Sequence, residues 1–402
     1  MKRILFNIRQ VTVREIFRMS SGSLILMVTL ILPVASTLFF WSLMKEGVPD
    51  KMPVAVVDLD QTQTSRKLIR NIDITPLSQV IMQPESIAEA LSELRKGNIY
   101  GFVVIPENLQ ADILASRQPV ISYYYQNSFL IAGGLMQNDL TMILHTLSGG
   151  INIQKREAMG QNEEEIMAQV QPVSLNTHLL FNPWSNYSVY VTSIVLPIML
   201  QIFILLMTVY SIGIEIKEKT SREWLRTSGK SVVVALTGKL LPYTAIFFIV
   251  MMFQNFILYK VLGIPMHANV GWLVLISLIY VLSYQAVGIF FIGLLPLMRH
   301  GLNLSAFYAI LALSLCGFSY PVEYMPSIFR FWAEAFPVRH YMHIFQRQIL
   351  AGGDLFYSLP DYLFMLLFLL LPFTVLYRLK SALIHQNHIE DLPQSYHQIT
   401  HA

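Results

Sequence analysis

The sequence predicts an α-helical polytopic membrane protein with six transmembrane helices and an inserted α/β domain. Hydrophobic residues make up 54% of the chain and charged residues only 13%. With a mean hydropathy of +0.50, a water-soluble protein would expose too much apolar surface. Six apolar stretches are each long enough to cross a hydrocarbon core of about 30 Å as a helix. A polar insert separates the first stretch from the other five.

The first apolar stretch runs without a charged residue from Met19 to Met44, and we assign residues 23–44 to the first transmembrane helix. Arg14 and Arg18 precede it, and it is longer than the apolar core of a signal peptide, so we interpret it as a permanent anchor. The remaining five stretches lie within residues 183–380. They are centred near Leu196, Phe248, Ile279, Leu311 and Leu367.

Basic residues predict the side of the membrane that each connection faces, because Lys and Arg of short loops stay preferentially in the cytoplasm. With six crossings, every strongly basic segment falls on one side. We therefore expect both termini, the loop 214–231 and the tail 381–402 to be cytoplasmic, and the insert 45–182 and the segment 320–358 to be exoplasmic. The basic residues concerned are Lys2, Arg3, Arg9, Arg14, Arg18, Lys217, Lys219, Arg222, Arg226, Lys230, Arg299, Arg378 and Lys380.

Residues 1–22 predict an amphipathic helix that lies in the cytoplasmic interface before the first crossing. In a helix from Arg9 to Arg18, the side chains of Val13, Ile16 and Phe17 are apolar and the arginines point outward. A basic flank that only obeys the orientation rule is the alternative interpretation. Both interpretations place the segment at the cytoplasmic surface.

The insert 45–182 alternates short β-type runs with helical ones, which favours a small α/β domain with partly parallel strand pairing. We expect strands at 53–58, 77–82, 99–105 and 120–125, and helices at 64–72, 85–96 and 107–115. Gly97 is the expected C-cap of the second helix, and Pro106 is expected in the first turn of the third. A longer helical passage from about Ile131 to Val170, interrupted at Gly149 and Gly150, returns the chain to the membrane.

Two further segments outside the spans are candidates for contact with a partner or with the membrane. The loop 214–231 carries Glu and Arg at helical spacing, which predicts a short helix with a charged face that docks on a cytoplasmic partner; a solvated loop is the alternative. The segment 320–358 holds several prolines and an aromatic run that includes Phe331 and Trp332. It suits a re-entrant segment, although an aromatic belt at the interface explains the same composition.

The spans carry no acidic or basic residue in their middle parts, because Lys239 and Asp361 lie near membrane edges. Ion-coupled transporters usually expose such groups to their pathway, so this pattern favours an apolar or amphipathic cargo and an external energy source. Polar residues within the spans are candidate pathway residues, and each is equally explained by a hydrogen bond between packed helices. They are Gln201, Thr208, Gln254, Asn255, Asn303 and Ser305.

Metal, catalytic and nucleic-acid functions find little support. His340 with His343, and His385 with His388, have ligand-like spacing, but the sequence offers no Cys or acidic cluster to complete either set. No nucleophile or carboxylate is grouped with a base at one depth, so we expect no enzymatic activity. The net charge of +3 reflects the orientation of the loops and forms no dense basic run for nucleic acid.

The whole layout resembles the membrane subunits of type-2 ABC exporters, in particular the subgroup with a large exoplasmic domain after the first helix. The runs Val54 to Asp60 and Gly101 to Glu107 are similar to that domain. In this family the loop between the second and third spans often reads Glu-Arg-Gly-Thr followed by Glu and Leu, and the present chain lacks the glycine. The last exoplasmic segment is similar in Pro321, Met325, Pro326, Phe336, Pro337, His340, Tyr341 and Arg347 to Gly352.

The resemblance implies a permease that catalyses nothing itself and pairs with a second permease subunit, as a homodimer or heterodimer, in a bacterial inner membrane. Two cytoplasmic ABC ATPase subunits on separate chains would bind the ATP, and a periplasmic adaptor and outer-membrane channel would extend the route for exported drugs, lipids or other hydrophobic compounds. The loop 214–231 and the N-terminal helix are the cytoplasmic features large enough to receive the push of the ATPase. The expected coupling residues are Glu215, Glu218, Thr220, Glu223, Trp224 and Leu225.

A different class of function is also compatible with the sequence. A membrane-anchored sensor or interaction protein would bind a ligand or partner with the α/β insert and use the spans as a scaffold. Removal of the insert would then abolish function while the loop 214–231 tolerated change, whereas an exporter would be sensitive at the loop.

Overall fold

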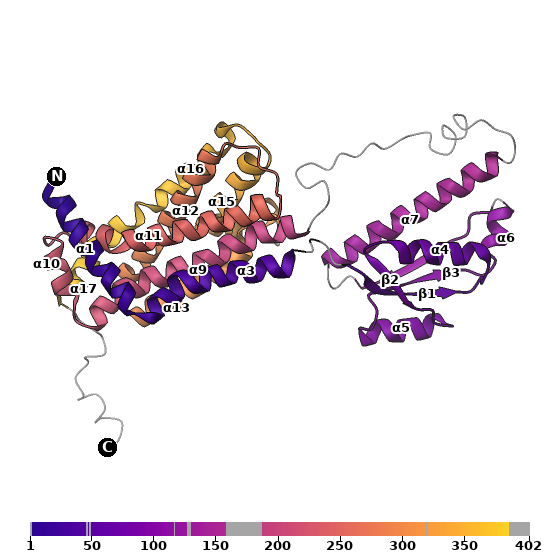
Figure 1. The fold of residues 1–402 in the computed structure, drawn as a ribbon, viewed down its shortest axis with the longest axis horizontal. Helices are drawn as coiled ribbons and strands as arrows, with labels where there is room; N and C mark the ends of the chain where they lie inside the picture. The colour runs from indigo at the N-terminus through magenta and orange to yellow at the C-terminus, as the bar shows by residue number, and fades with distance from the viewer. Residues whose placement is uncertain are drawn as a thin grey trace, which may run out of the picture. The chain divides into compact units, whose positions relative to one another are not determined.

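The computed structural model describes residues 2–45, 47, 50–115, 117–126, 130–157, 187–318 and 320–385. The chain forms two compact units. Residues 46–179 make an α/β unit, and residues 1–45 together with 180–402 make a helical unit (Figure 1). The residues from 158 to 186, where the expected return helix ends, lie outside the described residues.

The α/β unit is built on a four-stranded sheet with the strand order β2-β1-β3-β4. Strand β1 (Met52–Asp58) pairs in parallel with β2 (Ser78–Met82) and with β3 (Gly101–Ile105), and β4 (Ser122–Tyr125) pairs antiparallel to β3. Val54 of β1 lies opposite Gly101 of β3. The mixed sheet and the positions of all four expected strands are confirmed.

Helices cover both faces of this sheet, as Figure 1 shows. Helices α4 (Gln63–Ile74), α6 (Leu109–Leu114) and α7 (Leu130–Glu157) bury apolar side chains against one face, and α5 (Ile87–Lys96) covers the other. Because β1 and β3 are the central strands, their Val, Ile and Phe side chains are buried on both faces. The sheet is therefore the middle layer of a three-layer unit.

Three local expectations for this unit can be compared with the structure. Gly97 caps α5 with a left-handed backbone (φ +79°), as predicted. Pro106 was expected inside the third helix, but it lies in the turn before α6, whose N-cap is Asn108. The expected interruption at Gly149 and Gly150 is also wrong, because α7 continues through both residues.

The helical unit begins with α1 (Lys2–Ser21), so the N-terminal segment is a helix. Among the described residues, five segments are long and apolar enough to cross a membrane: Ser23–Met44, Ser188–Lys217, Val232–Val261, Val270–Leu294 and Leu355–His385. The expected fifth crossing corresponds to α13 (Met298–Leu315), which is shorter and begins with a polar turn. The chain is a multi-pass membrane protein, and the crossing by α13 stays a prediction.

These five candidate spans are made of consecutive helical segments. The first combines α2 (Ser23–Leu26), the π-helical turn η1 (Met27–Ile31) and α3 (Leu32–Met44), and the second is α9 (Tyr187–Lys217). The third joins α11 (Val232–Phe256) to a second π-helical turn, η2 (Ile257–Val261). Then come α12 (Val270–Leu294) and the pair α16 (Leu355–Phe368) and α17 (Leu371–His385).

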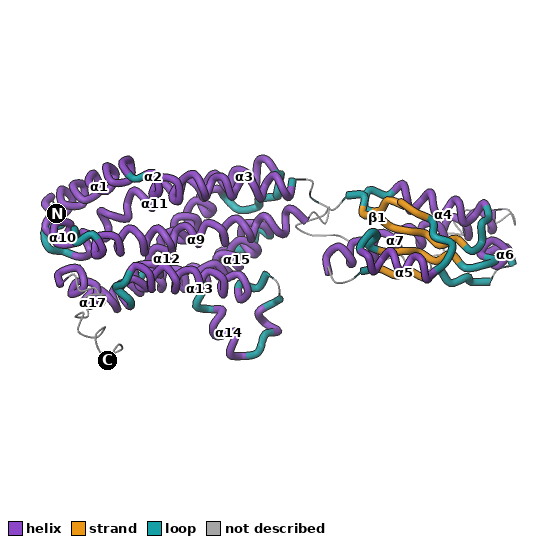
Figure 2. The backbone as a smooth tube through the Cα atoms, turned by 90° about the horizontal axis from the view of Figure 1, so that it is seen from below, coloured by secondary structure: helices purple, strands orange, loops and turns teal. Residues whose placement is uncertain are grey.

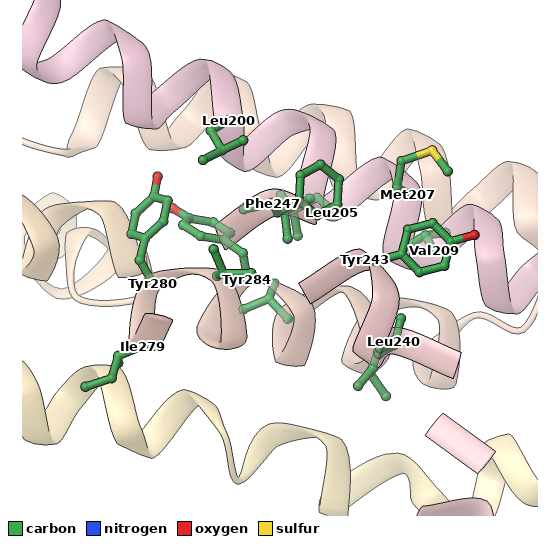
Figure 3. Close-up of a cluster of buried hydrophobic side chains, with 14 of the residues drawn as sticks. Leu200, Leu205, Met207, Val209, Leu240, Tyr243, Phe247, Ile279, Tyr280 and Tyr284 are labelled. Carbon is green, nitrogen blue, oxygen red and sulfur yellow. The ribbon is translucent and has the colours of Figure 1, made fainter. Parts of the chain in front are cut away.

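The core of the helical unit lies where α9, α11 and α12 meet. Figure 3 shows Leu200 and Leu205 of α9, Phe247 of α11, and Tyr280 and Tyr284 of α12 directed into one cluster. The two tyrosine rings stack edge to face at 4.9 Å. Helix α12 is buried over most of its length, so it is the central helix around which the other spans pack.

The segment 320–358 contains a 3₁₀ turn, η3 (Val322–Tyr324), two helices, α14 (Ser327–Ala333) and α15 (Pro337–Ile344), and the π-helical turn η4 (Phe345–Leu350). Helix α15 is almost entirely buried. On α14, by contrast, Phe331 is 75% and Trp332 is 55% exposed. The segment therefore has a buried part and an exposed aromatic part, and its place in the membrane stays a prediction.

Candidate functional site

The candidate site is a network of buried charges at the end of the helical unit where α1, α9, α11 and the short helix α10 (Ser221–Thr227) meet. Figure 2 shows α1 and α10 at the same end of the unit. Helix α1 lies against α11 because Gly238 of α11 leaves room for it. The Thr12 hydroxyl of α1 donates a hydrogen bond of 2.9 Å to the carbonyl of Gly238. Val11 and Met19 bury the same side of α1.

Lys239 lies at the centre of the network and is fully buried. Its ammonium group is 2.5 Å from a carboxylate oxygen of Glu15 on α1 and 2.9 Å from one of Glu215 on α9. It also lies 5.1 Å from the centre of the Trp224 ring of α10, within range of a cation–π interaction. The hydroxyl of Tyr243 donates a hydrogen bond to Glu15 over 2.9 Å. One lysine thus connects four helices.

Glu215 receives the largest number of donors in this network, and its side chain is fully buried. Arg14 binds both of its oxygens, at 2.7 and 3.1 Å. Arg18 binds one of them at 2.8 Å and reaches Glu218 with its other nitrogen. The Thr220 hydroxyl, just before α10, donates to the remaining oxygen. Bidentate Arg–carboxylate pairs fix orientation as well as charge, so Glu215 holds α1 at a defined position on α9.

The charges in this network balance. Unpaired charges are very costly to bury, and these are compensated by close opposite charges and hydrogen bonds. Partial burial disfavours the charged Arg14 guanidinium, but its hydrogen bond and attraction to Glu215 outweigh burial and raise its pKa above the ordinary value. Arg14 therefore stays cationic. The three acids are Glu15, Glu215 and Glu218, and the three bases are Arg14, Arg18 and Lys239.

Helix α10 is anchored on two sides. Trp224 is fully buried beside Lys239. On the other side, the Ser221 hydroxyl donates to the carbonyl of Leu383, and Arg222 Nε donates to the carbonyl of Ile384, over 2.7 and 2.9 Å. Both carbonyls belong to α17, which lies beside α10 in Figure 1. A displacement of α10 therefore acts on α1, α9, α11 and α17 together.

The six expected coupling residues differ in how far they are exposed. Glu215, Trp224 and Leu225 are buried and hold α10 and α1 in place, so they are not available for direct contact with another chain. Thr220 is half-buried and binds Glu215. Only Glu218 and Glu223 are exposed. A contact with a partner stays a prediction for these two residues.

The predicted apolar side of α1 is exposed, and its place in the membrane interface stays a prediction. Val13, Ile16 and Phe17 are 42%, 50% and 68% exposed, whereas Val11, Glu15 and Met19 face α11. The outward direction expected for the arginines is wrong for Arg14 and Arg18, which turn inward to Glu215. Glu15 and Lys239 were not predicted as partners. The available signal was the four-residue spacing of Val11, Glu15 and Met19, which places an acid on a buried face.

The candidate pathway residues lie at separate helix contacts. Gln201 of α9 donates to the Ala309 carbonyl of α13 at 3.4 Å, and Gln254 of α11 donates to Thr37 of α3 and to the Leu196 carbonyl of α9. Each of these contacts is a hydrogen bond between packed helices.

Of the remaining pathway candidates, one makes such an interhelical hydrogen bond and the other three make none in the described part of the chain. Asn255 of α11 donates to Ser277 of α12 at 3.1 Å, and Ser305 donates to the Gly301 carbonyl of its own helix. Thr208 is buried against the helix that carries Gly288, and Asn303 is exposed. A role in a pathway stays a prediction for all six residues.

A second polar cluster joins α15 to α16 and corrects the expectation that His340 and His343 have no acidic partner. One oxygen of Asp361 lies 3.0 Å from Nδ1 of His340 and 3.2 Å from Nδ1 of His343. The buried His340 ring stacks on Phe364 with 4.9 Å between ring centres, and its Nε2 lies 3.1 Å from the Glu334 carbonyl. Both ring nitrogens of His340 thus lie within hydrogen-bond distance of an oxygen atom. Within the described part of the chain, no three His, Cys, Asp or Glu side chains are placed to hold a metal ion.

A family model described as ABC-2 family transporter protein matches residues 23–378. Neither the curated proteins nor the solved structures gave a match.

Proposed function

This chain belongs to the ABC-2 transporter family, which supplies the membrane component of ABC transporters, and we propose that it is the permease of an ATP-driven exporter. The supporting observation is that the buried charge network joins α10 and α1 to the ends of α9 and α11. These four elements would therefore move together. In this proposal, an ATPase subunit on a separate chain binds α10 from the cytoplasm and holds the ATP.

The movement of the ATPase would be transmitted to the permease through specific contacts of α10. The exposed side of α10 carries Glu223 and Arg226, which meet the partner. Its buried side carries Trp224, which transmits displacement to Lys239 and hence to α1 and α9. A rigid, fully paired network suits this task because packed, hydrogen-bonded elements move as units.

The proposed cargo is a hydrophobic or amphipathic compound such as a lipid or a drug, moved outward from the cytoplasm or the inner membrane. In the five candidate spans, every Asp, Glu, Lys and Arg lies within the outer thirds, as for Lys239 and Asp361. A pathway between two permease subunits would then be apolar at mid-depth. A periplasmic adaptor and an outer-membrane channel are compatible with an α/β unit on the exoplasmic side.

The test distinguishes residues that bind the ATPase from residues that transmit its movement to the permease. Glu223→Lys with Arg226→Glu reverses the exposed charges of α10, and should weaken ATPase binding to the permease at least tenfold in a pull-down titration. Trp224→Ala should leave binding intact but lower cargo-stimulated ATP hydrolysis and efflux in reconstituted vesicles. A matched control, Glu85→Lys with Arg95→Glu on the α/β unit, makes the same charge swap at another exposed glutamate and arginine. Unaltered binding and efflux in both α10 variants would reject the proposal.

A sensor function has one observation in its favour. The α/β unit has a hollow of about 470 Å³ at the carboxyl ends of β1 and β3. In open α/β sheets, ligands bind at such positions when neighbouring strands connect in opposite directions. Asp60, Thr62, Glu107 and Gln110 line the hollow. If Asp60→Ala with Gln110→Ala abolished function while both α10 variants remained active, the sensor would replace the exporter.

A further inference from the structure

Helix α1 carries a hollow on the side that faces away from α11. Its volume is about 410 Å³, and it lies between α1 and the last residue of α10. The apolar side chains that border it recur along one line of the helix, and three of them are largely exposed: Phe6 at 57%, Val13 at 42% and Phe17 at 68%. The hollow is lined by Phe6, Arg9, Gln10, Val13, Arg14, Phe17 and Thr227.

The charge of this hollow is positive and is not compensated by the neighbouring network. The network already balances three acids against three bases. Arg9 is exposed and makes no ion pair or hydrogen bond with its side chain anywhere in the described part of the chain. Lys2 and Arg3 precede it on the same helix, and the adjoining α10 exposes Glu223 together with Arg222 and Arg226, so basic residues outnumber acidic ones around the hollow. The ligand that complements this hollow is therefore an anion.

The apolar side chains around the hollow and the position of α1 indicate which kind of anion binds there. Helix α1 ends at Ser21, and the first membrane span begins at Ser23. The hollow lies on α1, directly before the start of this span. This is the level where phospholipid headgroups and the first carbons of their acyl chains are found. A guanidinium binds a phosphate group with two parallel hydrogen bonds, and exposed aromatic rings suit the start of an acyl chain.

We propose that this hollow is a binding site for an anionic phospholipid, with Arg9 on the phosphate and with Phe6, Val13 and Phe17 along the acyl chains. Arg14 lines the hollow and also binds Glu215. A bound lipid therefore fixes α1 in the membrane surface and contacts the charge network through one arginine. The binding is a property of the permease alone.

Lipid titration of the purified permease in detergent, followed by native mass spectrometry, tests the proposal. The probes are phosphatidylglycerol, phosphatidylcholine with the same acyl chains, and glycerol phosphate without chains. Phosphatidylglycerol should bind most tightly, and Arg9→Gln should weaken it about fivefold, since one basic residue at a membrane surface contributes a factor of this size. Arg9→Lys should recover most of the affinity for phosphatidylglycerol.

The matched control is Arg3→Gln, which removes the same charge from the same helix at a residue outside the hollow. It should change the affinity by less than twofold. Equal losses in Arg3→Gln and Arg9→Gln would show a diffuse charge effect and overturn the site. Equal binding of the two lipids, or of glycerol phosphate and phosphatidylglycerol, would also overturn it.

Thermal unfolding checks that Arg9→Gln is folded, and no shift is expected because the Arg9 side chain makes no ion pair or hydrogen bond within the described residues. No ATPase takes part in the lipid titration. A negative result would therefore leave the coupling proposal for α10 standing, and a failure of coupling would leave the lipid site standing.

Discussion

Lys239 determines how the charges at the end of the helical unit are compensated. Glu215 keeps two arginines and a threonine hydroxyl even without the lysine. Within the described residues, the Glu15 carboxylate has only Lys239 and the hydroxyl of Tyr243 as partners. Removal of the lysine thus leaves one carboxylate, that of Glu15, buried without a cation. Breaking a buried ion pair in this way is far more costly than replacing both partners.

Lys239→Met is expected to lower the free energy of unfolding by about 3–5 kcal/mol. The double variant Glu15→Gln with Lys239→Met should recover most of this loss, because it removes both charges and leaves an amide that can still accept from Tyr243. Denaturant titration in mixed micelles measures both values. Lys260→Met is the control, since Lys260 is exposed at the end of the same composite helix, and its effect should stay within about 0.5 kcal/mol. Equal losses in the single and double variants would contradict the role of Lys239 as counter-ion.

At the scale of the element, the contact between α1 and α11 depends on a missing side chain. A Cβ atom at Gly238 would lie 2.8 Å from the Cβ of Val11 and 2.9 Å from the carbonyl oxygen of Ile8. Because Ile8 contributes backbone, rotation of a side chain cannot relieve this clash. The helix α1 would have to move away from α11, and overpacking of this kind usually costs about 1–3 kcal/mol.

Gly238→Ala is therefore expected to expose the inner face of α1. In a Cys316→Ala background, a cysteine in place of the buried Met19 should react slowly with a maleimide, and Gly238→Ala should speed this reaction severalfold. Gly271→Ala is a suitable control, because its new Cβ would meet only the Asn269 side chain, at 3.4 Å. If both alanine variants left the reaction rate unchanged, α1 would not need the space at Gly238.

At the scale of the whole molecule, local patterns predicted the elements and missed the long-range pairs. The short β-type run at 53–58 identified β1, and the apolar lengths identified the five spans. Two glycines suggested a break in α7, but glycine costs a helix only about 1 kcal/mol, and the rest of the helix tolerates it.

The pairs that form the candidate site could not be predicted in the same way. Glu15 and Lys239 are 224 residues apart in the sequence, and their meeting is set by helix packing. No local period carries that information. For the same reason the partner of His340 was missed, since Asp361 lies on the next helix, 21 residues away.

The number of crossings also belongs to the whole molecule, and α13 decides it. If α13 crosses, six spans place both termini and α10 on the cytoplasmic side. If it does not, the five candidate spans place the end of α17 on the other side from α1. In a Cys316→Ala background, single cysteines at Lys2, Arg95, Glu223 and His385 occupy exposed positions. With a membrane-impermeant maleimide on intact cells, only the one at Arg95, on α5, should react. The others should react after permeabilisation. Reaction at His385 in intact cells would show five crossings, and equal reaction at Arg95 and Glu223 would overturn the assignment of α10 to the cytoplasm.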